Sequence, residues 1–391
     1  MRYDIITLGA GPAGLTAAIH AAKEGARVCI LDKATRPGVK LLLAGGGKGN
    51  LTNRHVAPGD YVGENPAFAA PALERVPPET ILTVLEKAGI PLEEREHGRI
   101  FCQRSARAVL DFLLGRLPRT VALQTGMAAT GIRHLGGAFT VSCNDAAFHA
   151  PRCILATGGP AWPQCGADDS GLRLARLLGH RVVPPRPVLV PFVMPPDWPL
   201  AGLSGISLPA RVTCDAPGSP GFTDSLLFTH KGLSGPAALQ ISCWWRKGSP
   251  LRIDFLPDRD VGRLLDAATG KATPGSVLAR LLPERLLAAL LDPAVTRRRI
   301  AELSRKQRTA LADAVHRHAV TPLRTEGLTK AEAAAGGVDV AGVDPETMQS
   351  RLVPGLFFCG EVLDITGRLG GYNLHWAWAS GTVAGVAAGA V

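Results

Sequence analysis

The sequence predicts an α/β fold in which a Rossmann-type domain with a central parallel sheet carries an inserted cap. The first observation is the order of elements at the start, where apolar residues 5–8 run into Gly9-Ala10-Gly11-Pro12-Ala13-Gly14 and a helix of small residues. The second is the recurrence of apolar strands that end in glycine turns, at 153–159 and 355–361. The third is the change of composition between these two segments.

The opening turn has the spacing of a dinucleotide-binding motif. Gly9 permits the tight turn, Gly11 lets a pyrophosphate approach the backbone, and Gly14 lets helix and strand pack closely. A second strand at 27–31 then delivers Asp32, eighteen residues after Gly14, where a carboxylate would bind a ribose hydroxyl pair. Strand, turn, helix, strand and acid in this order predict a bound dinucleotide.

Composition describes an ordinary globular protein that is long enough for two domains. The chain has 391 residues, of which 46% are hydrophobic and 19% charged. The apolar segment 374–391 contains His375 and glycines at 381, 385 and 389, which fits a buried helix better than a membrane span. We therefore expect no membrane insertion.

The eight cysteines exclude two kinds of site. The closest pair, Cys143 and Cys153, is ten positions apart, so the chain has neither a CxxC redox pair nor a zinc-type spacing. Scattered single thiols without an export signal are typical of a reducing compartment. We expect no metal and a cytoplasmic location.

The chain is basic, with 43 Lys and Arg against 33 Asp and Glu and a net charge of +10. Such a charge can attract nucleic acid, an anionic membrane or an acidic substrate. The densest runs, 297–299 and 305–308, contain no interleaved aromatic residues and suit a solvated helix surface. We therefore expect a small-molecule substrate and regard nucleic acid as the less favoured partner.

A proline-rich segment marks a boundary in the chain. Residues 184–199 hold seven prolines, a density that a central strand or helix interior does not tolerate. Short β-type runs follow it, then Leu/Ala/Arg-rich segments with helical spacing. The predicted parts are a first dinucleotide-binding segment at 1–189, an inserted barrel-like β subdomain at 190–260, an inserted helical subdomain at 261–335, and a C-terminal segment of the dinucleotide-binding domain at 336–391.

Within the first part, two further segments look like strands. Residues 121–123 and 138–142 have the short, alternating pattern of an antiparallel hairpin region. The strand at 153–156 follows them.

The stretch 38–53 is too rich in Gly, Asn and Thr to pack as core. Backbone amides and short polar side chains are what a pyrophosphate and the edge of an isoalloxazine ring need at close range. Lys40 and Lys48 are the nearby cations that can neutralise phosphate. The alternative interpretation is a surface loop.

Three later turns favour FAD as the dinucleotide. Thr157-Gly158-Gly159 resembles the turn on which the chain of two-domain flavoproteins passes beneath FAD. Residues 360–364 resemble a turn that places an acid near the ribityl or phosphate groups. Residues 370–374 open a helix whose N–H groups can face the flavin N1–C2=O edge.

These patterns give one set of expected cofactor contacts. The expected FAD-binding residues are Gly9, Gly11, Pro12, Ala13, Gly14, Asp32, Lys33, Lys40, Gly45, Gly47, Asn50, Thr52, Asn53, Met127, Thr157, Gly158, Gly360, Glu361, Asp364, Gly371, Tyr372, Asn373 and Leu374. No second GxGxxG unit follows Gly14, so NAD(P)H, if it is used, visits the flavin transiently.

With these residues assembled, the chain resembles the BaiN-type (YhiN-like) bacterial flavoproteins, usually labelled NAD(P)/FAD-dependent oxidoreductases. The motifs that carry the resemblance are the GxGxxG start, 40–53, 96–101, 156–159, 228–237, 335–338 and 353–381. The resemblance covers nearly the whole chain. It implies FAD held noncovalently by a split Rossmann-type domain, with the inserted part capping the flavin to form a substrate cavity.

The chain departs from this family at three places. Gly47-Lys48-Gly49-Asn50 stands where the family usually has Gly-Gly-Gly-Arg-Cys-Asn. Cys102 replaces a usual proline, and His375 replaces a common glutamine. We expect these changes to leave flavin binding intact. The substrates of the family are therefore not assigned to this chain.

The catalytic residues are less well marked than the cofactor site. Hydride exchange at flavin N5 needs orientation, a dry site and one group that handles a proton. The candidates are Tyr372, His375 and His230. We expect an FAD-dependent oxidoreductase that exchanges a hydride with a small or medium organic substrate, by enone-type C=C reduction or by amine or alcohol oxidation.

Two other functions remain open from the sequence. One is a flavin-dependent RNA-modifying or RNA-binding protein, which the positive charge supports. The other is a flavin-binding sensor without turnover. The sequence also leaves open the direction of electron flow, the choice among NADH, NADPH and oxygen, and the oligomeric state.

Overall fold

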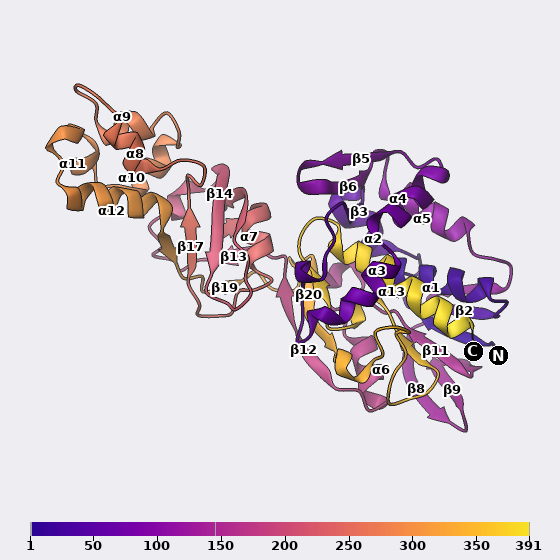
Figure 1. Cartoon of the computed structure of the whole chain (residues 1–391). Coiled ribbons are helices and arrows are strands. Elements are labelled where there is room, and N and C mark those ends of the chain that lie inside the picture. The colour runs from indigo at the N-terminus through magenta and orange to yellow at the C-terminus, as the bar shows by residue number, and fades with distance from the viewer. Residues whose placement is uncertain (1, 145, 391) are drawn as a thin grey trace. The chain divides into compact units, whose positions relative to one another are not determined.

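The computed structural model in Figure 1 describes residues 2–144 and 146–390. The chain divides into two compact units, unit 1 with Met1–Pro187 and Glu332–Val391, and unit 2 with Val188–Ala331. The sequence placed the corresponding boundaries after residues 189 and 335. The second predicted boundary cuts through strand β20 (Ala333–Val338), which pairs with β12 of unit 1 and therefore belongs to that unit.

A five-stranded parallel sheet forms the centre of unit 1. Its order is β21-β11-β1-β2-β7, and every neighbouring pair is parallel. The bounds are β21 (Leu356–Phe358), β11 (Arg152–Leu155), β1 (Ile5–Leu8), β2 (Val28–Asp32) and β7 (Val121–Thr125). Strands β1, β11 and β21 are buried along most of their length because helices cover a parallel sheet on its faces. The predicted α/β fold with a Rossmann-type parallel sheet is confirmed.

The predicted hairpin region is half wrong. Residues 138–142 do lie in an antiparallel sheet, of order β10-β9-β8, made of β8 (Ala129–Leu135), β9 (Ala138–Cys143) and β10 (Ala146–Ala150). Residues 121–123 instead lie in β7, which pairs in parallel with β2. A short run of alternating residues fits either pairing, and the partner strand decides.

Strand β12 (Val182–Val188) contains three of the prolines that we took for a break in regular structure. It pairs only with β20 in a two-stranded sheet. Proline lacks the N–H donor, so it is tolerated in an edge strand that hydrogen-bonds on one side. The proline-rich segment therefore combines an edge strand with the passage into unit 2.

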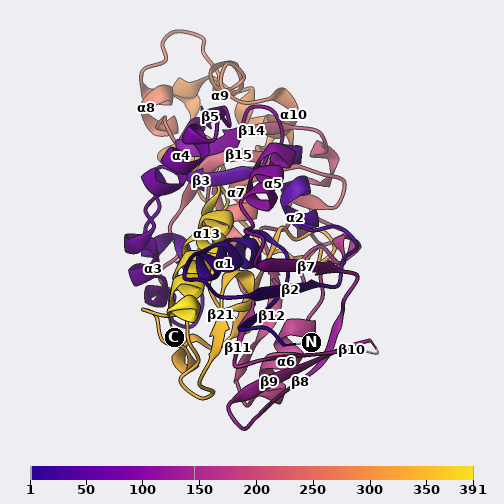
Figure 2. The same cartoon turned by 90° about the vertical axis from the view of Figure 1, so that its right-hand side faces the viewer.

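The two ends of unit 1 meet through helices α1 (Pro12–Lys23) and α13 (Tyr372–Gly389), which Figure 2 shows next to each other. Glycines at every fourth position of α13 face alanines at every fourth position of α1. A Cβ atom added to the glycine would lie 2.6, 2.3 and 2.9 Å from the alanine carbonyl oxygen in the pairs Gly381–Ala13, Gly385–Ala17 and Gly389–Ala21. The helices are therefore in backbone contact.

This contact explains the apolar C-terminal segment without a membrane. One whole side of α13, from Tyr372 to Ala388, is buried. Across the described part of the chain, the helices lack the length and apolar character that a bilayer span requires.

The other elements of unit 1 surround this core. They are α2 (Val39–Leu43), β3 (Asn50–Asn53), β4 (Tyr61–Val62), α3 (Ala70–Arg75), α4 (Pro78–Lys87), β5 (Leu92–Arg95), β6 (Arg99–Cys102), α5 (Ala106–Gly115), α6 (Ser170–Leu177) and β22 (Thr366–Gly367). Two of the pairings matter for the site, because β3 lies against β6 and β22 lies against β4.

Unit 2 contains a seven-stranded antiparallel sheet of order β18-β17-β14-β15-β16-β13-β19 and a group of short helices. The strands are β13 (Phe192–Val193), β14 (Ser207–Cys214), β15 (Phe222–Phe228), β16 (Gly232–Ser234), β17 (Leu251–Asp254), β18 (His318–Val320) and β19 (Arg324–Thr325). The helices are α7 (Gly235–Ile241), α8 (Val261–Asp266), α9 (Pro274–Leu278), α10 (Glu284–Leu290), α11 (Pro293–Thr296) and α12 (Arg305–His316).

Aromatic side chains hold the core of unit 2 together. The Phe228 ring stacks on Trp198 at 5.8 Å and on Phe255 at 6.3 Å between ring centroids. Strands β18 and β19 lie in the segment that the sequence assigned to a helical subdomain. They pair with β17 and β13, more than 60 and 120 residues earlier, and such long-range pairing leaves no local signal.

We predict that Gly385→Ala lowers the free energy of unfolding by about 1–3 kcal/mol, because its methyl group would overlap the Ala17 carbonyl. Helix propensity alone predicts a gain of about 1 kcal/mol for the same change. Denaturant unfolding checks the sign. The control is Val386→Ala on the 41% exposed position of the same helix, and a Gly385→Ala variant as stable as this control would contradict the packing.

Candidate active site

The opening turn has room for a pyrophosphate at one place and none at the others. Gly9 has a φ of 107°, and a Cβ there would lie 2.4 Å from the Ala156 carbonyl oxygen. A Cβ at Gly14 would lie 2.0 Å from the Gly9 carbonyl oxygen, whereas a Cβ at Gly11 meets no atom within 4 Å. The turn therefore closes tightly on the sheet and leaves its outer face, at Gly11 and Pro12, accessible to a phosphate at the α1 N-terminus.

Asp32 lies at the end of β2 beside this turn. Its carboxylate accepts hydrogen bonds from the Ala10 N–H (2.5 Å) and the Ala34 N–H (2.7 Å). The Met127 N–H donates to the Asp32 carbonyl at 2.8 Å. Asp32 and Met127, both predicted to contact the cofactor, are thus neighbours at the carboxyl end of the sheet.

A cavity of about 510 Å³ lies beside Lys33, the residue after Asp32. Residues 128–130, Asp168 and five residues of α6 also line it, and the Lys33 ammonium lies 2.6 Å from an Asp168 carboxylate oxygen. The cationic rim also includes Arg173 and Arg176. The cavity suits a polar or anionic group next to Asp32.

Turns from three parts of the chain converge on the first helix. A Cβ at Gly360 would lie 2.8 Å from the Ala13 Cβ, and a Cβ at Gly159 would lie 3.2 Å from the Glu361 side chain. The Gly360 N–H donates to the Ser380 hydroxyl of α13. The predicted turns at 9–14, 157–159 and 360–361 therefore form one continuous surface.

Lys40 and Glu361, both expected at the cofactor, form an ion pair. The Lys40 Nζ lies 2.7 Å from a Glu361 carboxylate oxygen, and the other oxygen accepts from the Ala334 N–H at 3.1 Å. This half-buried pair links two segments 321 residues apart. Each group keeps the other in place, and Lys40 can also face a phosphate.

The glycine-rich stretch reaches the N-terminus of α13 through β3. Gly371 has a φ of 99°, and a Cβ there would lie 2.3 Å from the Thr52 carbonyl oxygen and 2.9 Å from the Asn50 Oδ1. Gly45 and Gly47 lie in the 3-10 turn that precedes β3. The sequence placed all five residues at the flavin, and the structure brings Gly371, Thr52 and Asn50 into contact.

The buried polar atoms without a hydrogen-bond partner among the described residues include Asn50 Oδ1 and Thr157 Oγ1, as well as Nε2 of the catalytic candidate His375. Buried polar atoms are almost always paired in folded proteins. Asn50 and Thr157 belong to the set expected to contact FAD, and Gly158 next to Thr157 leaves open space beside its backbone. These residues fit a cofactor that supplies the missing partners.

The start of α13 adds donors of the right kind. Tyr372, Asn373 and Leu374 form its first turn, and no side chain caps the helix at Gly371. The N–H groups of a first turn have no partner inside the helix and carry partial positive charge. This end of the helix fits the carbonyl edge of a flavin ring.

Other predicted cofactor residues instead hold the site together. The Asn53 amide donates to the Gly370 carbonyl at 2.9 Å, and the Asn373 amide exchanges two hydrogen bonds of 2.8 Å with the Gly367 backbone. Asp364 accepts from two backbone N–H groups at 2.8 and 3.0 Å, and its burial raises the pKa of this carboxyl. Asn53 and Asn373 therefore shape the chain around Gly370 and Gly371, whereas Asp364 binds the backbone of Glu64 and Gly336.

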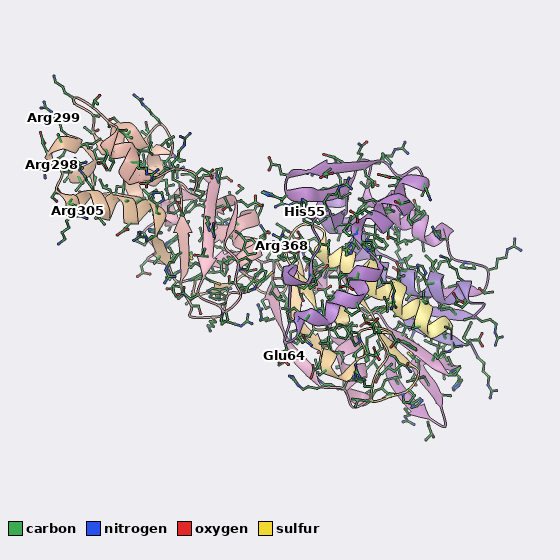
Figure 3. All side chains as sticks on the ribbon, in the orientation of Figure 1. His55, Glu64, Arg298, Arg299, Arg305 and Arg368 are labelled. Atoms are coloured by element: carbon green, nitrogen blue, oxygen red, sulfur yellow. The ribbon has the colours of Figure 1, made fainter. Side chains whose placement is uncertain are left out.

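A cluster that the sequence did not single out surrounds Tyr372. The Arg368 Nη2 donates to the Tyr372 hydroxyl at 2.8 Å, and this hydroxyl donates to the His55 carbonyl at 3.4 Å. The Arg368 Nε lies 2.8 Å from an Asp60 carboxylate oxygen. Figure 3 labels Arg368 and His55 in this part of unit 1.

The environment of Tyr372 keeps its proton in place. Burial raises the pKa of Tyr372 to about 12, and the neighbouring Arg368 charge opposes part of that shift. The Arg368 guanidinium lies 4.7 Å above the tyrosine ring. Its position two residues before Gly370 is the sequence signal that could have placed Arg368 at the site. Its pairing with Asp60 could not be predicted, because Asp60 lies 308 positions earlier in the chain.

The two histidine candidates lie in different surroundings. His375 is fully buried, and its Nδ1 lies 2.8 Å from the Thr52 hydroxyl. Burial lowers the pKa of His375 to about 4, so it is neutral near pH 7. His230 is exposed between β15 and β16 of unit 2, whereas the cluster around Tyr372 belongs to unit 1.

Comparison with known proteins identifies the family. The sequence model of the family described as the HI0933-like protein Rossmann domain matches residues 3–387 of this chain. The chain belongs to this family. The resemblance to BaiN-type and YhiN-like flavoproteins inferred from the motifs is confirmed, and the protein is a flavoprotein of the oxidoreductase class.

Several relatives match this chain nearly end to end. An Escherichia coli protein named ribosomal RNA dihydrouridine synthase is 37% identical over 391 residues, covering 97% of this chain and 96% of the relative. A Clostridium scindens protein named 3-dehydro-bile acid delta(4,6)-reductase is 33% identical over 402 residues, covering 97% and 98%.

Solved structures support the same fold. The E. coli quinol fumarate reductase FrdA aligns over 100% of this chain and 70% of its own with a TM-score of 0.53 and 19% identity. A Rhodococcus jostii 3-ketosteroid-delta4-(5alpha)-dehydrogenase aligns over 99% and 97% with a TM-score of 0.51 and 15% identity. At these identities the likeness concerns the fold alone.

We predict that Gly11→Val yields a folded protein that does not retain FAD. The new side chain enters the space beside the turn without touching protein, so it blocks only what approaches from outside. The flavin absorbance per protein is expected to fall at least about tenfold, with far-UV circular dichroism unchanged. The control is Gly115→Val, also free of contacts, and a yellow Gly11→Val protein would contradict the assignment.

We also predict that His375 makes the protein less stable in mild acid. Its pKa of about 4 lies below the ordinary 6.5, so the unfolded chain binds the proton more tightly between these values. The contribution of its neutral form to stability is full above pH 6.5 and is lost as the pH falls towards 4. The loss amounts to at most about 3 kcal/mol.

Urea unfolding of the wild type and of His375→Gln from pH 7 to pH 4 measures this effect. Glutamine cannot take up a proton, so the variant should show a flatter dependence of stability on pH. Equal slopes for the two proteins would mean that His375 does not change its proton occupancy on folding.

Proposed function

We propose that this protein is an FAD-dependent reductase that saturates a C=C bond conjugated to a carbonyl, and that the bond belongs to a uracil base of ribosomal RNA. The observation that carries the reaction is the Asp60–Arg368–Tyr372 cluster at the N-terminus of α13. A cation and a phenol placed together suit a substrate whose carbonyl becomes negative as the double bond is reduced.

Reduced FAD, when bound, would supply the hydride, and the chain would supply the groups that orient the substrate, stabilise its charge and deliver a proton. Addition of a hydride to the far carbon of a conjugated C=C bond leaves negative charge on the carbonyl oxygen and the near carbon. Arg368, held by Asp60, stabilises that charge, and the Tyr372 hydroxyl, to which Arg368 donates, is protonated near pH 7 and can deliver the proton. Proton transfer to the near carbon completes the reduction.

The names of the end-to-end relatives support this chemistry. Dihydrouridine formation and reduction of a Δ4,6 bond in a 3-dehydro compound both saturate C=C bonds conjugated to a carbonyl. They do not support the amine or alcohol oxidation that the sequence left open. The two relatives therefore share the type of reaction, as their names describe it, and differ in the substrate.

Charge favours RNA over a small molecule. Unit 2 contains 19 Lys and Arg against 12 Asp and Glu, a net charge of +7 in 144 residues out of +10 for the chain. A second relative with the RNA name, from Haemophilus influenzae, is also 37% identical over 96% of the chain. Both observations run against our sequence-based expectation of a small-molecule substrate. That expectation assigned the densest basic runs to a solvated helix surface.

The second candidate substrate is a small cyclic enone. The bile-acid reductase at 33% identity supports it. An enone substrate needs the same cluster around Tyr372 but gives no role to the positive charge of unit 2. The two candidates therefore differ in whether unit 2 contributes to substrate binding.

The test is a single turnover without oxygen. FAD-loaded protein is reduced with dithionite, mixed with unmodified ribosomal RNA transcript or with a steroid enone, and followed at the flavin absorbance band. We expect reoxidation by the RNA and nucleosides carrying two additional hydrogens in the mass spectrum of the digest. Reoxidation by the enone alone would overturn the RNA assignment, and reoxidation by neither would overturn the reductase.

In the same assay, Tyr372→Phe is expected to lower the rate of product formation about 10²–10³-fold, the range for loss of a general acid. Flavin content should stay unchanged, because phenylalanine keeps the buried ring. The control is Tyr3→Phe, which removes a partly exposed hydroxyl elsewhere in unit 1. An unchanged rate in Tyr372→Phe would assign the proton to another group.

A further inference from the structure

The positive charge of the chain is concentrated in the helical part of unit 2. Residues 261–320 hold 11 Lys and Arg against 5 Asp and Glu, so 60 residues carry +6 of the total of +10. The remaining 331 residues are close to balance. A local surplus of this size produces a field that attracts polyanions.

Five residues at the junction of α11 and α12 form what we call the α11–α12 basic surface: Arg297, Arg298, Arg299, Arg305 and Lys306. All five are exposed. The first three follow the end of α11, and the last two begin α12. Figure 3 shows Arg298, Arg299 and Arg305 pointing away from the ribbon where α11 ends and α12 begins.

The segment that carries this surface is anchored to the core of unit 2. Ile300 and Leu303 are buried between the two sets of cations. The Arg308 guanidinium donates to the Ile300 carbonyl at 2.9 Å and pairs with an Asp266 carboxylate at 2.7 Å. Arg308 therefore points inward and has a structural role, whereas the five cations project from a fixed backbone.

Within residues 261–320, all of which the structure describes, no carboxylate pairs with any of the five cations. The contact of Arg298 is with the Glu302 backbone carbonyl, at 3.2 Å. Arg305 and Lys306 lie in the first turn of α12, where a positive charge opposes the helix dipole by about 0.3–1 kcal/mol each. Helix stability does not explain their placement.

An RNA backbone explains these features better than a membrane does. Membrane-surface helices combine basic residues with exposed large apolar side chains. The exposed large hydrophobics of unit 2, Leu281 and Leu323, lie outside the segment 293–310. Arginine, which supplies four of the five cations, binds phosphate through two parallel hydrogen bonds.

We infer that the α11–α12 basic surface binds the phosphate backbone of the RNA substrate, an inference that rests on the proposed function. Phosphate contacts fix the position of an RNA and add affinity, but they do not select a base. Base selection and reduction then remain with the flavin site of unit 1, and the surface of unit 2 sets how tightly RNA is held.

The test compares two triple variants that lose the same charge. The first is Arg298→Gln, Arg299→Gln, Arg305→Gln. The matched control is Lys87→Gln, Arg119→Gln, Arg133→Gln, which removes three exposed cations of unit 1 that have no described ion-pair partner. Circular dichroism and bound-flavin absorbance verify that both variants fold.

Binding is measured by fluorescence anisotropy of a labelled ribosomal RNA fragment across a series of KCl concentrations. Each lost phosphate contact reduces the slope of log K against log salt by about 0.7–0.9. We expect the first variant to lose about two in slope and at least about tenfold in affinity at 150 mM KCl. In single turnovers its rate at saturating RNA should match the wild type, with a higher half-saturating RNA concentration.

The outcomes separate this inference from the proposed function. If the wild type reduces RNA and the first variant binds RNA as the control does, the inference is overturned. If the first variant alone loses RNA binding while the wild type forms no dihydrouridine, the surface stands and the proposed function fails. Binding to phosphatidylglycerol vesicles that exceeds RNA binding and is lost in the first variant would overturn the inference in favour of a membrane.

Discussion

The site depends on the backbone contact between α1 and α13. Because small residues recur at every fourth position on both helices, Gly385 approaches the Ala17 carbonyl more closely than any residue with a Cβ allows. This contact sets the C-terminal helix against the helix that follows the phosphate turn. The turn at Gly360 then lies on Ala13, and the start of α13 lies against β3.

The residues predicted to bind the cofactor divide into two groups in the structure. Gly11, Asn50 and Thr157 present open space or unpaired buried polar atoms, as a binding surface should. Asn53 and Asn373 form hydrogen bonds with the neighbouring backbone and thereby fix the shape of the Gly370–Gly371 turn. Both groups are needed, because a flexible turn would not hold the N-terminus of α13 in one orientation.

The two units contribute different interactions, short-range hydrogen bonds in unit 1 and long-range electrostatic attraction in unit 2. Unit 1 offers a buried tyrosine, Tyr372, whose hydroxyl accepts a hydrogen bond from Arg368, and Arg368 is held by Asp60. Unit 2 offers exposed cations on an anchored backbone, whose attraction for polyanions is long-ranged and screened by salt. A reductase acting on a base within a large RNA requires both interactions.

The sequence by itself determined the parallel-sheet fold, the flavin family and the roles of Gly9, Gly11 and Gly14, because the strand–turn–helix motif is local and its spacing carries the geometry. Only the tertiary structure decided that residues 121–125 join the parallel sheet, that β18 and β19 complete the sheet of unit 2, and that Arg368 meets both Asp60 and Tyr372. Those outcomes depend on partners that are distant in the sequence, and a pattern of neighbouring residues does not record which distant backbone or side chain will complete its hydrogen bonds.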